Sequence, residues 1–141
     1  HFPSQLVRPQ GRAAGGMTGL SLRDDDTVIF FSSIDTPEHA SVVTVAAAAG
    51  TLPGAEPGTA KVSAFSEFPA KGRATGGVRA QRLLAGEDHL ACAWVGSGIP
   101  AAVDARGRAI ALPNTPAKRD ASGTPVAGII AGIGEIGSVP A

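Results

Sequence analysis

The feature that most constrains this chain is an internal repeat. Residues 11–17 follow the pattern Gly-Arg-x-x-Gly-Gly and then an apolar residue, and residues 72–78 follow the same pattern. After each copy come a short apolar stretch, an acidic turn and a second apolar run, and a weaker third copy begins at Arg119. Self-similarity over such a distance is typical of arrays and propellers, in which every unit buries one face on its neighbours.

The segments between the turns have the composition of β-strands. Short runs rich in β-branched or aromatic residues, bounded by Gly, Pro or acidic clusters, favour strands over helices. Residues 59–65 alternate in polarity, so Val62 and the alanines should share one face and Thr59, Lys61 and Ser63 the other. We expect strands at residues 28–31, 41–45, 59–65, 78–84, 90–95 and 109–112.

This strand pattern predicts an all-β fold of propeller-like blades, each with about four antiparallel strands. We expect one repeat-built domain over residues 1–141, with blade-like units at roughly 11–71 and 72–130 and a flexible tail at 131–141. The glycine-rich end is either poorly ordered or a last strand that pairs with a sheet edge. Two units cannot close a ring, so their unpaired edges invite self-association or continuation into a longer array.

The charge total sets a condition on any function in nucleic-acid binding. The chain has 12 basic and 12 acidic residues, so its formal net charge is zero. A nucleic-acid-binding domain is usually basic, so the basic residues would have to gather on one face. Cys92 is the only cysteine, which excludes an intramolecular disulfide and fits a reducing cytoplasm. Its apolar neighbours predict a buried structural thiol.

The ends of the sequence carry no targeting pattern. His1, Phe2 and Pro3 do not begin a signal peptide, and no apolar run is long enough to cross a membrane. Because the first residue is not Met, we expect the chain to be an excised piece of a longer one.

The second copy of the repeat contains a basic cluster. No acidic residue interrupts the stretch from Lys71 to Arg82, and its glycines let the backbone approach a partner closely. Basic side chains beside open backbone amides suit phosphate contacts, which fix position without reading sequence. The alternative is a glycine-rich turn with a solvated charged face. The candidate DNA-contacting residues, including those of the other two copies, are Arg12, Lys71, Arg73, Arg79, Arg82, Lys118 and Arg119.

Other chemistry finds little support in the sequence. The aspartates at 24–26 do not begin a calcium loop, because Ile29 and Asp35 occupy the positions that need Gly and Glu. His39 or His89 with a serine would be the components of a hydrolase, but Ser97 does not lie in a Gly-x-Ser-x-Gly elbow. We therefore expect no catalytic residues, no metal site and no cofactor.

Residues 68–79, which run Phe-Pro-Ala-Lys-Gly-Arg-Ala-Thr-Gly-Gly-Val-Arg, are followed by the acidic turn Gly86-Glu87-Asp88. Together they resemble the blade motif in the C-terminal domain of the A subunits of DNA gyrase and topoisomerase IV, and residues 7–17 resemble the preceding blade. The likeness covers roughly residues 4–130, and the Ala-, Gly- and Arg-rich composition is similar to that of actinobacterial members.

The resemblance implies a β-pinwheel, here a partial one, whose blades exchange strands and whose basic rim wraps and bends duplex DNA without reading its sequence. The basic residues named above fall on the family's motif positions. The implied partners are double-stranded DNA, the rest of the topoisomerase A polypeptide and, through it, the B polypeptide of the same enzyme. The implied location is the cytoplasm of a bacterium, in association with the nucleoid.

The parent implied by the resemblance is an ATP-dependent type IIA topoisomerase, which cleaves DNA through a tyrosine. This chain has no tyrosine, so it cannot perform that step. The Gln-Arg-Arg-Gly-Gly-Lys-Gly box of true gyrases is absent, which leaves gyrase and topoisomerase IV open as the parent. The alternative function is a β-rich protein-interaction or structural module that does not bind DNA.

Overall fold

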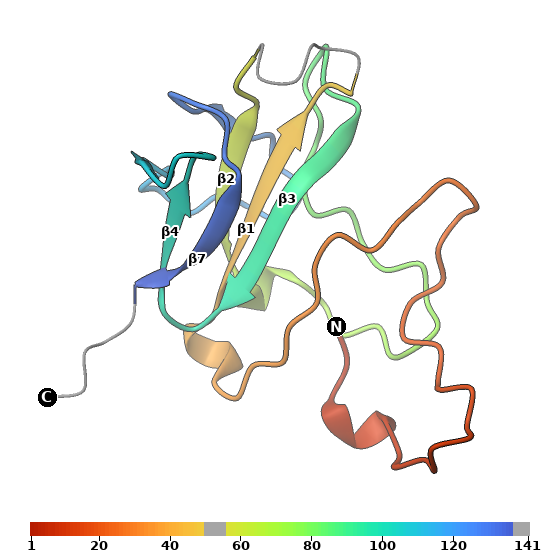
Figure 1. Cartoon of the computed structure of the whole chain (residues 1–141). Helices are drawn as coiled ribbons and strands as arrows, with labels where there is room; N and C mark the ends of the chain where they lie inside the picture. Colours follow the sequence, from red (N-terminus) through yellow and green to blue (C-terminus); the bar gives the residue numbers. More distant parts are fainter. Residues whose placement is uncertain (50–55, 137–141) are drawn as a thin grey trace, which may run out of the picture.

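Two antiparallel sheets form the frame of the chain, which a computed structural model describes over residues 1–49 and 56–136 (Figure 1). The four-stranded sheet has the order β3-β1-β2-β6 and the three-stranded sheet the order β5-β4-β7. Their bounds are β1 Ser41–Ala47, β2 Thr59–Ala64, β3 His89–Gly96, β4 Ile99–Val103, β5 Ala109–Ile110, β6 Thr124–Pro125 and β7 Gly132–Ile136. The described residues form no α-helix, only the 3-10 turns η1 Ser4–Leu6, η2 Pro37–His39 and η3 Phe65–Glu67. The predicted all-β class is confirmed. No helix in the described ranges has the length and apolarity to cross a membrane.

The two sheets are built on one plan. In the first, β1 and β2 form an antiparallel hairpin and β3 pairs with the outer side of β1. In the second, β4 and β5 form the hairpin and β7 pairs with the outer side of β4. The four-stranded sheet gains its last strand when β6, which follows the second hairpin in sequence, pairs with β2. One sheet therefore takes a strand from the segment that lies within the other unit, as in blades that exchange strands.

The sequence repeat and the sheets are out of phase. The expected units at 11–71 and 72–130 divide the four-stranded sheet between them, because β1 and β2 precede the boundary while β3 and β6 follow it. The cause is that the second and third Gly-Arg copies each lie after the hairpin and before the third strand of a sheet. The repeat seen in the sequence therefore starts about half a unit away from the start of a sheet.

The expected strands fall into two groups. Those at 41–45, 59–65, 90–95 and 109–112 are confirmed as β1, β2, β3 and a shorter β5. The prediction for 28–31 was wrong: these residues pair with no strand, and Phe31 is 84% exposed. The prediction for 78–84 was also wrong, because only an isolated bridge from Arg82 to Ser122 forms there. Composition favoured both strands, but a strand also needs a continuous backbone partner. Residues 28–31 have none in the described chain, and 78–84 have only the single bridge.

The flexible tail predicted at 131–141 was wrong for residues 132–136, which form β7 and pair with β4. The alternative, a last strand on a sheet edge, is confirmed there, while 137–141 lie outside the described residues. The sequence also missed β4, because Pro100 argues against a strand interior. Pro100 is tolerated since β5 pairs only with Ala102 and Val103, which leaves one side of β4 open at the proline.

A small core lies between the two sheets. Val45, Ala60, Ala102, Val126 and Ile130 are each at most 8% exposed and pack together. The partly buried Cys92 packs against this cluster, and its burial raises the pKa of the thiol. This core consists of alanine and β-branched aliphatic side chains.

The polar face of β2 is buried rather than solvated. Thr59, Lys61 and Ser63 are 7%, 2% and 0% exposed, whereas Ala64 on the opposite face is exposed. The alternation of faces was predicted correctly. Solvent does not lie on the polar face, because the later copies of the Gly-Arg repeat cover it.

Candidate nucleic-acid interface

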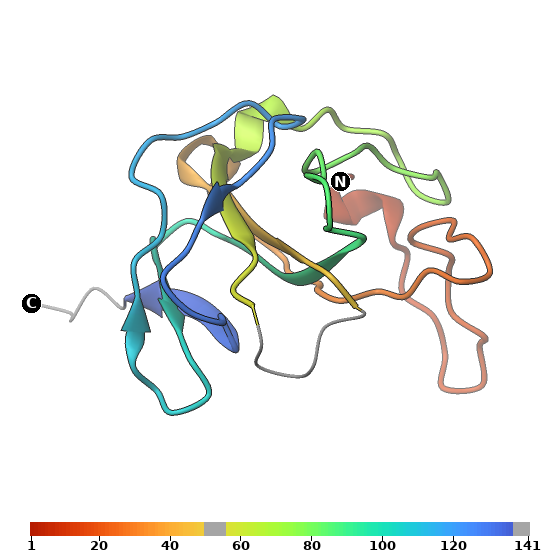
Figure 2. The same ribbon diagram turned by 90° about the horizontal axis from the view of Figure 1, so that it is seen from above.

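Three loops carry the Gly-Arg copies and lie next to one another. We call them segment 1 (residues 11–21), segment 2 (residues 72–82) and segment 3 (residues 118–126). Segment 2 accepts and donates backbone hydrogen bonds with segment 1: the Ala74 N–H donates to the Gly19 carbonyl at 2.9 Å, and the Ser21 N–H donates to the Thr75 carbonyl at 3.0 Å. Both loops lie on the side of the four-stranded sheet away from β4 and β7 (Figures 1 and 2).

Segment 3 docks on segment 2 in the same way. The Arg82 N–H donates to the Ala121 carbonyl at 3.1 Å, and an isolated parallel bridge joins Arg82 to Ser122. Counted from the arginine of each copy, this bond joins the same two positions as the bond from Ser21 to Thr75. The weak third copy therefore repeats this backbone contact of the second.

The repeated arginine makes a repeated contact. Arg73 Nη1 donates to the Thr18 carbonyl at 2.8 Å, and Arg119 Nη1 donates to the Arg79 carbonyl at 2.5 Å. Thr18 and Arg79 occupy the same position in segments 1 and 2, six residues after Arg12 and Arg73. The arginine of one copy thus fastens the carbonyl of the copy before it, and each segment is held to the next by its side chain as well as its backbone.

The backbone conformation at the second glycine of the Gly-Gly pair explains why the motif has glycine there. Gly16 and Gly77 have φ of 85° and 72°, in the left-handed region that side chains with a Cβ rarely adopt. Gly123 is buried in segment 3 for a different reason, since an added Cβ would lie 2.6 Å from Thr59 Oγ1 and 2.7 Å from Gln81 Nε2. The glycines therefore shape the loops and let segment 3 approach the sheet.

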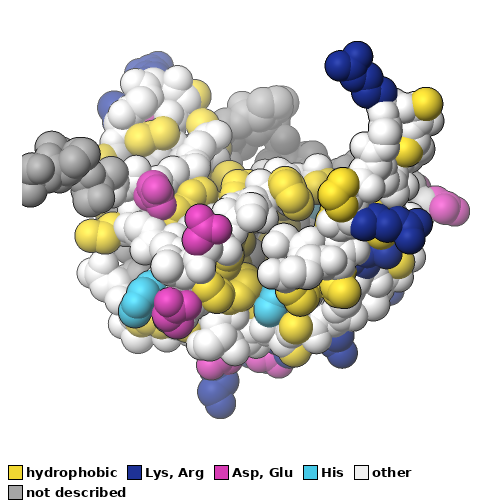
Figure 3. Space-filling view, turned by 90° about the horizontal axis from the view of Figure 1, so that it is seen from below, with side chains coloured by type: hydrophobic (Ala, Val, Ile, Leu, Met, Phe, Trp, Pro, Cys, Tyr) yellow, Lys and Arg dark blue, Asp and Glu magenta, His cyan; other side chains and the backbone are white. Residues whose placement is uncertain are grey.

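The seven candidate cations divide by exposure. Arg12, Lys71, Arg79, Arg82 and Lys118 are exposed, while the two fastening arginines, Arg73 and Arg119, are partly buried. Within residues 1–49 and 56–136, none of the seven forms an ion pair; the ion pairs there join Asp88 to His89 and Asp104 to Arg108. On the face shown in Figure 3, the Lys and Arg side chains lie mostly at the margins, and hydrophobic side chains occupy much of the centre.

A buried polar layer lies between segments 2 and 3 and the sheet. Lys61 Nζ donates to the carbonyls of Ala80, Lys118 and Arg119, the second at 3.1 Å. Burial lowers the pKa of Lys61 from its ordinary 10.5 to about 8, with the Asp120 carboxylate acting in the opposite direction. Sequence reasoning missed this role of Lys61. One sequence feature could have indicated this role: Lys61 alternates with the short polar residues Thr59 and Ser63, which leave room above β2 for other segments.

Comparison with known proteins decides the family. The model of the DNA gyrase C-terminal domain, a β-propeller, matches residues 1–35 and 58–91, which contain segments 1 and 2. The gyrase A protein of Aeromonas salmonicida is 35% identical over 77 residues, which cover 55% of this chain and 7% of that protein. The chain belongs to the DNA gyrase C-terminal domain family.

Membership of this family confirms the resemblance found in the sequence, and the antiparallel sheets agree with its propeller fold. The chain spans only a small part of the length of the gyrase protein it matches. Segment 3 lies outside both matched ranges. Its equivalence to the other two copies rests on the repeated backbone and arginine contacts.

The acidic turn and the histidines do not assemble a second site in this gyrase-family chain. The Asp26 N–H donates to the Arg23 carbonyl and closes a turn, and no group of three or more His, Cys, Asp or Glu in the described ranges could hold a metal ion. Ser97 hydrogen-bonds with Thr36 at 2.8 Å rather than with a histidine. Of the hydrolase components considered from the sequence, the structure thus pairs neither His39 nor His89 with Ser97.

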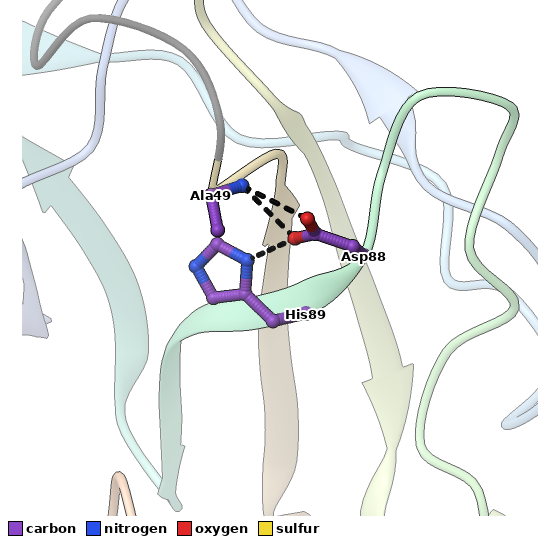
Figure 4. Close-up of polar contacts among 3 residues, drawn as sticks. All are labelled: Ala49, Asp88 and His89. Carbon is purple, nitrogen blue, oxygen red and sulfur yellow. Dashed lines mark hydrogen bonds and ion pairs between the residues drawn. The ribbon is translucent and has the colours of Figure 1, made fainter.

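Asp88 and His89 instead fasten the start of β3. His89 Nδ1 lies 2.6 Å from Asp88 Oδ1, and the Asp88 carboxylate also accepts the Ala49 N–H at 2.9 Å (Figure 4). The hydrogen bond with His89, followed by that from Ala49, lowers the pKa of the Asp88 carboxyl. The contact closes the end of the β1·β3 ladder.

Replacing Gln81 with methionine should weaken the attachment of segment 2. Thr44 Oγ1 donates to Gln81 Oε1 at 2.7 Å, and Gln81 Nε2 donates to Thr59 Oγ1 at 3.0 Å. Gln81 is 3% exposed, so losing both bonds removes partners from buried hydroxyls, at a cost of about 2 kcal/mol. Urea unfolding measures this cost, with Gln10→Met at an exposed position as the control. Equal stability of the two variants would contradict the prediction.

Proposed function

We propose that this chain is a DNA-binding and DNA-bending module of a type IIA topoisomerase, and that it binds duplex DNA without reading the sequence. The observation that carries the proposal is the docking of the three Gly-Arg segments. The docking joins loops that carry exposed cations of successive copies, and none of these cations forms an ion pair with an acidic side chain in the described part of the chain. Membership of the gyrase C-terminal domain family supports the same function.

The seven candidate residues take two roles in this proposal. The exposed ones, Arg12, Lys71, Arg79, Arg82 and Lys118, contact phosphate oxygens. Arg73 and Arg119 hold neighbouring segments together through backbone carbonyls, so they set the spacing of the others. A neutral total charge is compatible with this function because only the local field near the loops attracts the phosphates.

The proposal extends to the parent protein. The module is non-catalytic, since the chain has no tyrosine to cleave DNA. Its parent is the A polypeptide of a bacterial gyrase or topoisomerase IV, which works with ATP and the B polypeptide in the cytoplasm, at the nucleoid. The repeat units at 11–71 and 72–130, whose boundary divides the four-stranded sheet, each contain one strong copy of the Gly-Arg motif. Self-association would use the free side of β5, which lacks the fourth strand that β6 supplies to β2.

Salt dependence of duplex binding tests this function. Each phosphate contact contributes about −0.9 to the slope of log affinity against log salt concentration. We expect the triple variant Arg79→Ala, Arg82→Ala, Lys118→Ala to lower affinity for duplexes of any sequence and to make the slope about 2 to 3 units shallower. Fluorescence anisotropy with two unrelated duplexes, over a range of salt concentrations, measures both quantities.

The control is Arg106→Ala, which removes an exposed charge from the β4–β5 turn, outside all three segments. Its salt slope should equal that of the wild type. Absence of wild-type binding at low salt would reject the proposal for this chain and favour the protein-interaction module instead. A triple variant with the wild-type slope would show that other residues contact the DNA.

A further inference from the structure

Lys61 is a buried cation without an acidic hydrogen-bond partner in the described residues. It lies on β2, is 2% exposed, and its Nζ donates to the carbonyl oxygens of Ala80, Lys118 and Arg119. An ammonium group has three N–H donors, so the three carbonyls satisfy it completely. Because its partners are all backbone carbonyls, the buried ammonium of Lys61 serves to hold these backbone atoms in place.

The three carbonyls belong to two different segments. Ala80 lies in segment 2 between Arg79 and Arg82, and Lys118 and Arg119 begin segment 3. The two segments meet directly above Lys61, where the Arg82 N–H donates to the Ala121 carbonyl and Arg119 Nη1 to the Arg79 carbonyl. Lys61 therefore lies beneath the junction between segments 2 and 3 and holds both segments to β2.

We propose that Lys61 is a positioning residue for DNA binding, which sets the spacing of Arg79, Arg82 and Lys118 by holding the backbones of segments 2 and 3 to β2. This inference rests on the proposed function. Lys61 itself does not touch DNA, because its ammonium is buried under the loops. Its contribution is the fixed geometry of exposed cations that lie on separate parts of the chain.

Protonation determines how many carbonyls Lys61 can hold. The charged groups that act on it are Asp120, which favours the ammonium most, Glu67, which also favours it, and Arg119, which opposes it. Desolvation exceeds these effects and brings the pKa to about 8, so at neutral pH most of the protein carries the ammonium. The neutral amine has only two donors and must release one carbonyl.

The test uses Lys61→Met, which keeps an unbranched side chain one atom shorter and removes its donors, and Arg106→Met, which matches the change in net charge at an exposed site. We call the hold of Lys61 on segments 2 and 3 the clamp. Amide hydrogen exchange measures, in the absence of DNA, how firmly the clamp holds the two segments. In Lys61→Met, the amides of Arg82 and Ala121 should exchange at least about tenfold faster, because the carbonyls that hold these segments lose their partner. Amides of β4 and β7 should keep their wild-type rates.

Duplex binding is measured on the same variants. Lys61→Met should bind about tenfold more weakly and with a shallower salt slope, although every exposed cation is still present. Arg106→Met should match the wild type in both measurements. Lys61→Gln, which has two donors, should fall between the wild type and Lys61→Met, and it replaces Lys61→Met if the latter does not fold.

Each outcome decides between the two proposals. Unchanged exchange at Arg82 and Ala121 overturns the clamp. Faster exchange with unchanged DNA affinity overturns its role in positioning the cations. If the wild type fails to bind DNA while exchange still accelerates in Lys61→Met, the proposed function is rejected, together with the positioning role, and Lys61 is a structural clamp alone.

Discussion

Gly58→Ala is expected to unfold a large part of the four-stranded sheet. An added Cβ would lie 1.8 Å from the carbonyl oxygen of Ala46 and 2.9 Å from its carbonyl carbon, both of which belong to the backbone of β1. A backbone atom cannot move aside as a flexible side chain does, so β1 and β2 must separate at this point. The Val126 N–H donates to the Gly58 carbonyl, so the approach of segment 3 is disturbed as well. We expect a loss of about 3 kcal/mol or more in the free energy of unfolding.

Gly11→Ala is the matched control, because no atom lies within 4 Å of the Cβ that it would add. Urea unfolding followed by far-UV circular dichroism compares the two variants with the wild type. Gly11→Ala should stay within about 0.5 kcal/mol of the wild type, as is usual for a surface substitution. A Gly58→Ala variant as stable as Gly11→Ala would mean that β1 and β2 do not approach this closely.

Local pattern was sufficient to predict β1, β2 and β3. The β-branched run at β1 and the alternation at β2 predict both strands, and they are neighbours in sequence, with residues 48–58 between them. The run around Trp94 likewise predicts β3. In these segments composition, period and an available partner all favour the same structure.

Pairing between distant segments could not be predicted from composition. The run 28–31 has strand composition but pairs with no other strand in the described residues, while β4 contains Pro100 and still forms, because β7 supplies its partner. The phase of the sheets relative to the repeat depends on the same non-local pairing, since β6 lies on β2 rather than beside the hairpin that precedes it.

The candidate site was predicted in part. The sequence pointed to the three basic loops, and the structure brings them into contact. It did not show that Arg73 and Arg119 bind carbonyls, because that role depends on the neighbour's backbone rather than on the arginine's own surroundings. For the same reason the third copy looked weak: backbone hydrogen bonds can repeat without repeating the side chains that make a motif visible.

Raising the pH from about 8 to 10.5 is expected to increase the contribution of Lys61 to stability. Burial lowers its pKa to about 8 in the folded chain, whereas the unfolded chain should titrate at its ordinary value of 10.5. Between these values the unfolded state binds more protons, so the free energy of unfolding rises with pH, by at most about 1.4 kcal/mol per pH unit. Below pH 8 both states are protonated and this contribution is constant, at its least favourable value.

The difference in unfolding free energy between the wild type and Lys61→Met isolates this effect. The raised pKa of Cys92 acts in the opposite direction above pH 9, since the unfolded chain then releases a proton that the folded chain keeps, but the thiol is present in both proteins and cancels in the difference. Urea unfolding at half-unit steps from pH 7 to 10.5 should give a difference that is flat to about pH 8 and then rises. If Lys61→Met does not fold, the same rise should appear in Cys92→Ala alone, which lacks the opposing thiol. A difference that stays flat would mean that the Lys61 ammonium is solvated, and its three carbonyl bonds would then lose their importance for holding segments 2 and 3 to the sheet. A difference that falls would mean that the carbonyls and Asp120 favour the ammonium more than burial opposes it, which would contradict the lowered pKa.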